Sequence, residues 1–118
     1  MTELKSQGVW DDVVLVQTYF GRTLTPNSSG GSDHGWNGNY WMAGGGVKGG
    51  QIKGKYPSSF AEENIGRGRL IPTTPFDSCF HGVAGWVSVE TEKELNQVLP
   101  NRNNFDNHCM ASDLFDTK

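Results

Sequence analysis

Glycine is the residue that most restricts what this chain can form. The sequence has 118 residues and 16 glycines, and 11 of the glycines lie between Gly21 and Gly54. Large side chains such as Trp36 and Tyr40 lie in the same stretch, so it is not a low-complexity linker. Glycine adopts backbone conformations that other residues avoid, and it lets two backbones approach closely. We therefore predict a fixed, tightly turning loop region, and such regions often carry binding sites.

The size and charge of the chain exclude several classes of function. Its length suits one small domain. The formal net charge is -3 and the pI is about 5.5, so no basic surface for nucleic acid is expected. No apolar run is long enough to span a bilayer, and no signal peptide follows Met1, which leaves localisation open. Cys79 and Cys109 could pair once or stay as free thiols.

The N-terminal half is predicted to contain half of an α/β unit. Residues 2–7 have the pattern of a helix end that stops at Gly8, and residues 13–18 form an apolar, β-branched run. A run without alternation is typical of a strand covered on both faces in a parallel sheet. Residues 40–43 indicate a second short strand, and residues 47–52 a hairpin with a two-glycine turn. Because so few strands do not make a stable sheet, we expect partner strands from outside the chain.

The C-terminal half is predicted to be helical and then irregular. Thr74 suits the N-cap of a helix and Pro75 its first position, and apolar residues on one helical face follow them. Thr91 and Glu94 have the spacing of a capping box for a shorter helix. Residues 101–118 are polar and are expected to be irregular.

Asp33 and His34 are the candidate metal ligands. An adjacent carboxylate and imidazole suit zinc, calcium, magnesium or manganese, although a catalytic metal needs at least one further ligand from elsewhere. In open α/β sheets, ligands bind beyond the carboxyl ends of strands, where this loop is expected to lie. The alternative is that Asp33 caps a turn and that His34 is a hydrogen-bonded loop residue.

Arg22 is the candidate anion-binding residue. It follows the predicted strand, and its guanidinium matches the geometry of phosphate or sulfate. A structural ion pair is the alternative role, which we favour for Arg67 and Arg69. The sequence contains no G-x-S-x-G elbow and no Ser-His-Asp order, so no catalytic residue is assigned.

Four ordered motifs are similar to those of one protein family. They are residues 20–23 with 33–36, residues 44–50 with Ile52, Gly54, Tyr56 and Pro57, residues 66–74, and residues 98–101 with Phe105. Over residues 4–105 they resemble the C-terminal part of the sulfatase-like domain-of-unknown-function family 1501, in the alkaline phosphatase superfamily. The resemblance implies a doubly wound α/β fold with a mostly parallel sheet, here the C-terminal portion, which is incomplete on its own. It also implies hydrolysis of phosphate or sulfate esters at a divalent-metal centre.

The resemblance also assigns site residues and shows which family residues this sequence lacks. Asp33 and His34 match the family's Asp-His-Gly-Trp pattern, and Arg22 lies in its Phe-Gly-Arg-Thr string. The family usually has an acidic residue before that string, whereas this chain has Tyr19, a poor metal ligand. The nucleophile of such proteins belongs to their N-terminal part, which the resemblance does not cover. We expect residues 1–105 to form a partial sulfatase-like domain, followed by a polar tail at 106–118.

Three functions follow from these observations. The first is a fragment or subunit of a metal-dependent phosphate or sulfate ester hydrolase, weakly active or inactive alone. The second is a non-catalytic accessory or scaffold subunit, bound to a protein partner that completes the sheet. Its interface would use the aromatic residues Trp36, Tyr40 and Trp41. The third is a carbohydrate- or anion-binding module that uses the same aromatic residues.

Overall fold

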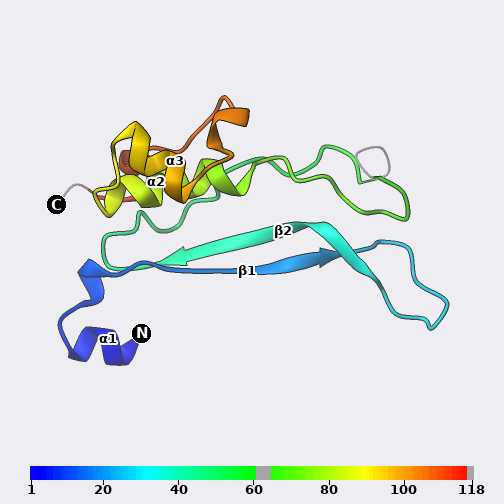
Figure 1. The fold of residues 1–118 in the computed structure, drawn as a ribbon. Coiled ribbons are helices and arrows are strands. Elements are labelled where there is room, and N and C mark those ends of the chain that lie inside the picture. Colours follow the sequence, from blue (N-terminus) through cyan, green and yellow to red (C-terminus); the bar gives the residue numbers. More distant parts are fainter. Residues whose placement is uncertain (61–64, 117–118) are drawn as a thin grey trace. The chain divides into compact units, whose positions relative to one another are not determined.

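The chain forms two units and passes between them several times. Unit 1 comprises Met1–Leu15, Ala43–Ile52 and Thr74–Lys118, and unit 2 comprises Val16–Met42 and Lys53–Thr73. The computed structural model describes residues 1–60 and 65–116 (Figure 1). Helices and one small sheet make up its regular structure, so the chain combines both kinds of element.

Two long strands dominate unit 2. β1 (Leu15–Arg22) and β2 (His34–Ala43) run side by side as a two-stranded antiparallel sheet (Figure 1). The pairing continues one residue beyond the strands, since the Thr23 amide donates to the Asp33 carbonyl at 3.0 Å. The Asp33 amide in turn donates to the Thr23 hydroxyl at 3.1 Å, and Thr23 is buried. This closure fixes one end of the two-stranded ribbon formed by β1 and β2, and the candidate ligands Asp33 and His34 lie at that end.

The environment predicted for the first strand is wrong. The sequence predicted a strand over residues 13–18, covered on both faces of a parallel sheet. The strand instead begins at Leu15 and pairs with an antiparallel neighbour, and the four residues 17–20 are exposed. The described part of the chain adds no third strand to this sheet and therefore no parallel neighbour. An apolar run indicates that burying these side chains is favourable, but it does not identify the structural element that packs against them.

The hairpin predicted over residues 47–52 is also absent from the described residues. Val47 forms an isolated antiparallel bridge with Phe115 instead. The Lys48 amide donates to the Leu114 carbonyl at 2.8 Å, and the Asp116 amide donates to the Gly46 carbonyl at 2.8 Å. These distant partners take the backbone groups that a local hairpin would have used.

Unit 1 contains short helices from both ends of the chain. They are α1 (Thr2–Ser6), η1 (Trp10–Asp12, a 3-10 helix), α2 (Phe76–Trp86), α3 (Glu92–Val98), η2 (Arg102–Asn104, also 3-10) and α4 (Ala111–Leu114). The helix end before Gly8 and the Thr91–Glu94 capping box are confirmed. α2 begins one residue later than predicted, because Pro75 rather than Thr74 occupies the N-cap.

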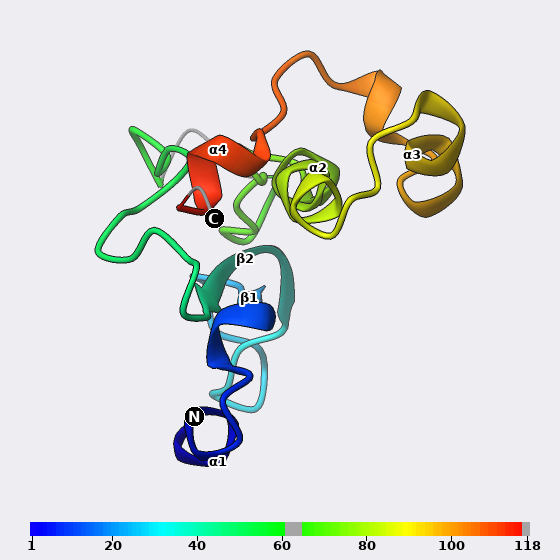
Figure 2. The same ribbon diagram turned by 90° about the vertical axis from the view of Figure 1, so that its left-hand side faces the viewer.

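The core of unit 1 lies among α2, α3 and the C-terminal segment. Ala84, Leu95 and Leu99 form a buried cluster. α4 packs beside α2 (Figure 2). Leu114 and Phe115 are buried, with exposed fractions of 5% and 2%. The irregular segment predicted over residues 101–118 therefore contains a short helix and the most deeply buried ring among the described residues. In residues 1–60 and 65–116, no helix is long and apolar enough to cross a membrane.

Candidate functional site

Asp33 lies at the loop end of the two-stranded ribbon, and both of its carboxylate oxygens have partners. Asn27 Nδ2 donates to Asp33 Oδ1 at 2.9 Å, and an Arg67 terminal nitrogen binds Asp33 Oδ2 at 2.5 Å. The hydrogen bonds from Asn27 and Arg67 hold the pKa of the Asp33 carboxyl below its ordinary value. The carboxylate is thus charged, neutralised by a cation and turned toward the loops of its own chain.

Arg67 reaches Asp33 from a strained turn. Gly66, Arg67 and Gly68 have φ values of +84°, +54° and +70°, so three successive residues are left-handed. A Cβ on Gly68 would lie 2.5 Å from the Leu24 Cβ, so this position requires glycine. The Thr25 amide donates to the Arg67 carbonyl at 3.1 Å and thereby fixes the turn against the preceding loop. The ion pair that we favoured for Arg67 is confirmed.

Asn27 organises the loop between the strands, a role that was not predicted from the sequence. Its side-chain oxygen accepts hydrogen bonds from the amides of Ser29 and Gly31, at 3.1 and 2.9 Å, while its nitrogen binds Asp33. Asparagine bonds locally to the backbone in this way in many turns. The Asn-Ser-Ser-Gly-Gly string at this point is the signal from which this role could have been predicted.

His34 begins β2 and is exposed. Its ring lies against Phe20, with centroids 4.1 Å apart and planes tilted by 45°. In the described ranges, no three His, Cys, Asp or Glu side chains are grouped so that they could hold a metal ion. A cation bound by Asp33 would also have to displace Arg67. These residues alone do not complete a metal centre, and ligation by Asp33 and His34 stays a prediction.

Arg22 is placed at the end of β1. One terminal nitrogen donates to the Ser32 carbonyl at 2.5 Å, and the guanidinium lies 5.7 Å from the Phe20 ring centroid. The residue therefore ties the strand end to the loop before Asp33. These contacts do not show whether Arg22 binds an anion, so its anion-binding role stays a prediction.

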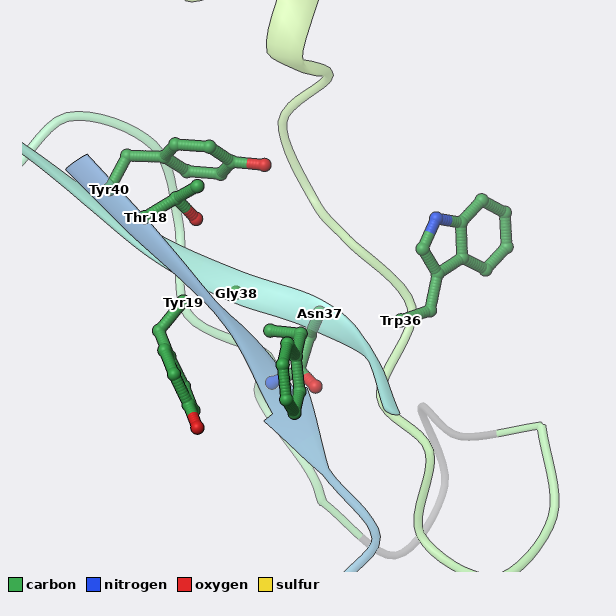
Figure 3. A pocket seen from close by; sticks show the side chains of 7 residues that line it. Thr18, Tyr19, Trp36, Asn37, Gly38 and Tyr40 are labelled. Atoms are coloured by element: carbon green, nitrogen blue, oxygen red, sulfur yellow. The ribbon is translucent and has the colours of Figure 1, made fainter. Parts of the chain in front are cut away.

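The aromatic residues of the ribbon are exposed. Tyr19 and Trp36 have exposed fractions of 67% and 66%, and Tyr40 and Trp41 each have 47%. An open hollow of about 300 Å³ lies on this ribbon, lined by Thr18, Tyr19, Phe20, Trp36, Asn37, Gly38 and Tyr40 (Figure 3). The rings of Tyr19 and Trp36 point in different directions (Figure 3). The ribbon thus exposes several aromatic side chains and an open hollow rather than an enclosed pocket.

Comparison with known proteins identifies one family. A family model described as a protein of unknown function (DUF1501) matches residues 1–65, which include both strands and the loop that carries Asp33. No curated protein and no solved structure matches the chain. The match covers more than half of the 118 residues. The chain therefore belongs to the DUF1501 family of proteins of unknown function.

Proposed function

We propose that this chain is a non-catalytic binding part of a protein assembly, and that its ribbon accepts an extended strand from a protein partner. The observation that carries the proposal is the composition of the ribbon. The 8 residues of β1 and the 10 of β2 contain a single formally charged side chain, Arg22. Proteins normally protect exposed strand edges with lysine, proline or inward-pointing charges, and those devices are missing here.

The energetics of the ribbon favour an added strand. A two-stranded sheet is marginally stable in water, and it gains stability from a third strand or from a cover on its apolar face. The described residues supply no third strand to this sheet. In strand addition, main-chain hydrogen bonds provide affinity and side-chain contacts provide specificity. The exposed rings of Tyr19, Trp36 and Trp41 are of the type enriched at the centres of protein interfaces.

The occupied state of Asp33 supports a binding role over a catalytic one. A metal-dependent hydrolase needs carboxylates that face the metal. Here the Asp33 carboxylate is held by Asn27 and Arg67, and these bonds order the loop that closes the ribbon. The same residue thus contributes to the shape of the binding surface.

The test combines a cross-link with hydrogen exchange. A photo-crosslinking amino acid replaces Trp41 in protein produced in its native cell, and the matched control replaces Ile52, which is 83% exposed in unit 1. We expect a cross-linked protein partner from position 41 and none from position 52. In the recovered complex, amides along one strand should exchange at least about ten-fold more slowly than in the isolated chain. A complex whose strand amides exchange unchanged would exclude strand addition.

A second candidate is the ester-hydrolase part, which rests on the sulfatase-like resemblance of residues 20–23 and 33–36. Residues 1–65, which match the family of unknown function, contain the Phe-Gly-Arg-Thr and Asp-His-Gly-Trp strings. In this case Arg22 would bind an anionic ester, and ligands from outside the chain would complete a metal centre with Asp33 and His34. Elemental mass spectrometry of chelator-free protein tests it. A stoichiometric divalent metal that is lost in Asp33→Ala would support this function over the binding role.

A further inference from the structure

Two cysteines lie on neighbouring segments of unit 1. Cys79 is in α2 and Cys109 precedes α4, and both residues are half-buried thiols. The Cys109 amide donates to the carbonyl of Ser78, the residue directly before Cys79, at 2.9 Å. A Cβ on Gly82 would lie 3.0 Å from the Cys109 carbonyl oxygen. The segment that carries Cys109 therefore lies directly on α2.

This spacing suits a disulfide. Bridged cysteines have Cα atoms about 4.4–6.8 Å apart. A backbone hydrogen bond from Cys109 to the residue next to Cys79 brings the two Cα atoms close to that range. Burial raises the pKa of the Cys79 thiol, and the charge of Cys109 raises it further.

We propose that Cys79 and Cys109 form a redox pair whose disulfide ties α2 to the segment before α4. The oxidant is a small disulfide of the glutathione class. The Cys109 thiolate attacks it and forms a mixed disulfide, and one small thiolate leaves and takes up a proton. The Cys79 thiol then loses its proton and attacks the Cys109 sulfur, and the second small thiolate leaves and takes up that proton. Two protein thiols are oxidised to one disulfide, and the external disulfide is reduced to two thiols.

Cys109 is the better first nucleophile for a physical reason. The thiolate is the reactive form, and the raised pKa of the Cys79 thiol makes Cys79 the poorer first nucleophile. His81 fixes the position of the Cys109 segment, because its Nδ1 lies 3.2 Å from the Cys109 carbonyl oxygen. The His81 ring also stacks on His108 with centroids 4.9 Å apart. These contacts hold Cys109 against α2 while the mixed disulfide is resolved.

The cross-link would stabilise unit 1. It would close a loop that contains α3 and η2, and it would anchor the segment leading to the buried Leu114 and Phe115. Cross-links that close long loops restrict the unfolded chain most. We expect the thermal midpoint of the oxidised chain to exceed that of the reduced chain by at least roughly 5 °C.

The experiment treats the full chain with oxidised glutathione and follows mass, linked peptides and thermal unfolding. The expected product is a monomer that has lost two hydrogen atoms, with a Cys79–Cys109 linked peptide and a raised midpoint. In Cys79→Ser the reaction should stop at a glutathione adduct on Cys109, with no rise in the midpoint. Two adducts on the wild-type chain, or a disulfide-linked dimer, would overturn the proposal. A monomeric linked form that melts below the reduced chain would overturn it as well.

Discussion

Replacing Phe115 with alanine should destabilise unit 1 more than any other single truncation of an aromatic ring. Phe115 is only 2% exposed, and its ring stacks on Trp86 with centroids 4.7 Å apart and planes 16° from parallel. Burying a phenylalanine side chain contributes roughly 1.5–3 kcal/mol. The cavity left after truncation raises the expected cost to about 3–5 kcal/mol. Domains of this size have total stabilities of about 5–15 kcal/mol, so Phe115→Ala should remove a large part of it.

Urea unfolding followed by tryptophan fluorescence measures this loss, because Trp86 lies against the deleted ring. Phe105→Ala is the matched control, since Phe105 is 38% exposed and should lose less than about 1 kcal/mol. Equal midpoints for the two variants would refute the reasoning. In that case the bridge between Val47 and Phe115 would not anchor the C-terminal segment in the core.

Three further perturbations test other parts of the structure. Thr91→Ala should cost α3 about 1 kcal/mol in urea unfolding, because the Thr91 hydroxyl accepts from the Glu94 amide. Gly68→Ala should lower the thermal midpoint of unit 2, with a cost of about 1–3 kcal/mol, because the added Cβ meets Leu24 in a left-handed backbone. The pKa of Asp33 is lower in the folded chain than its unfolded value of about 3.8, so the ionised carboxylate stabilises the fold at pH values above 3.8. This contribution is lost as the pH falls through the folded pKa. Asp33→Asn should therefore be less stable than wild type at pH 7, and the difference should shrink in acid-unfolding curves.

The features that could be predicted from the sequence depend on neighbours in the chain. The Thr91–Glu94 capping box joins residues three apart, and both of its hydrogen bonds are present. The stop at Gly8 needs only a left-handed residue after a helix, and Gly8 has a φ of +70°. These two signals depend only on residues that are close in the chain.

The features that escaped prediction depend on distant partners. Asp33 matched a ligand pattern, but its partner Arg67 lies 34 positions away and decides the state of the carboxylate. Val47 pairs with Phe115 rather than within a hairpin. Leu114 and Phe115 are two adjacent apolar residues in a polar segment, too short a signal for a periodic pattern to identify.

The division of unit 1 into three stretches has a consequence for the order of events during translation. Residues 1–15 leave the ribosome before the rest of unit 1, and the Phe115 ring of the same unit follows 100 positions later. At roughly 5–20 residues per second, this interval is on the order of 5–20 seconds. The strands β1 and β2, with their exposed tyrosines and tryptophans, are made within that interval. The nascent chain therefore exposes the aromatic residues of β1 and β2 before the core of unit 1 can form. A chaperone or an assembly partner would have its greatest effect in this period.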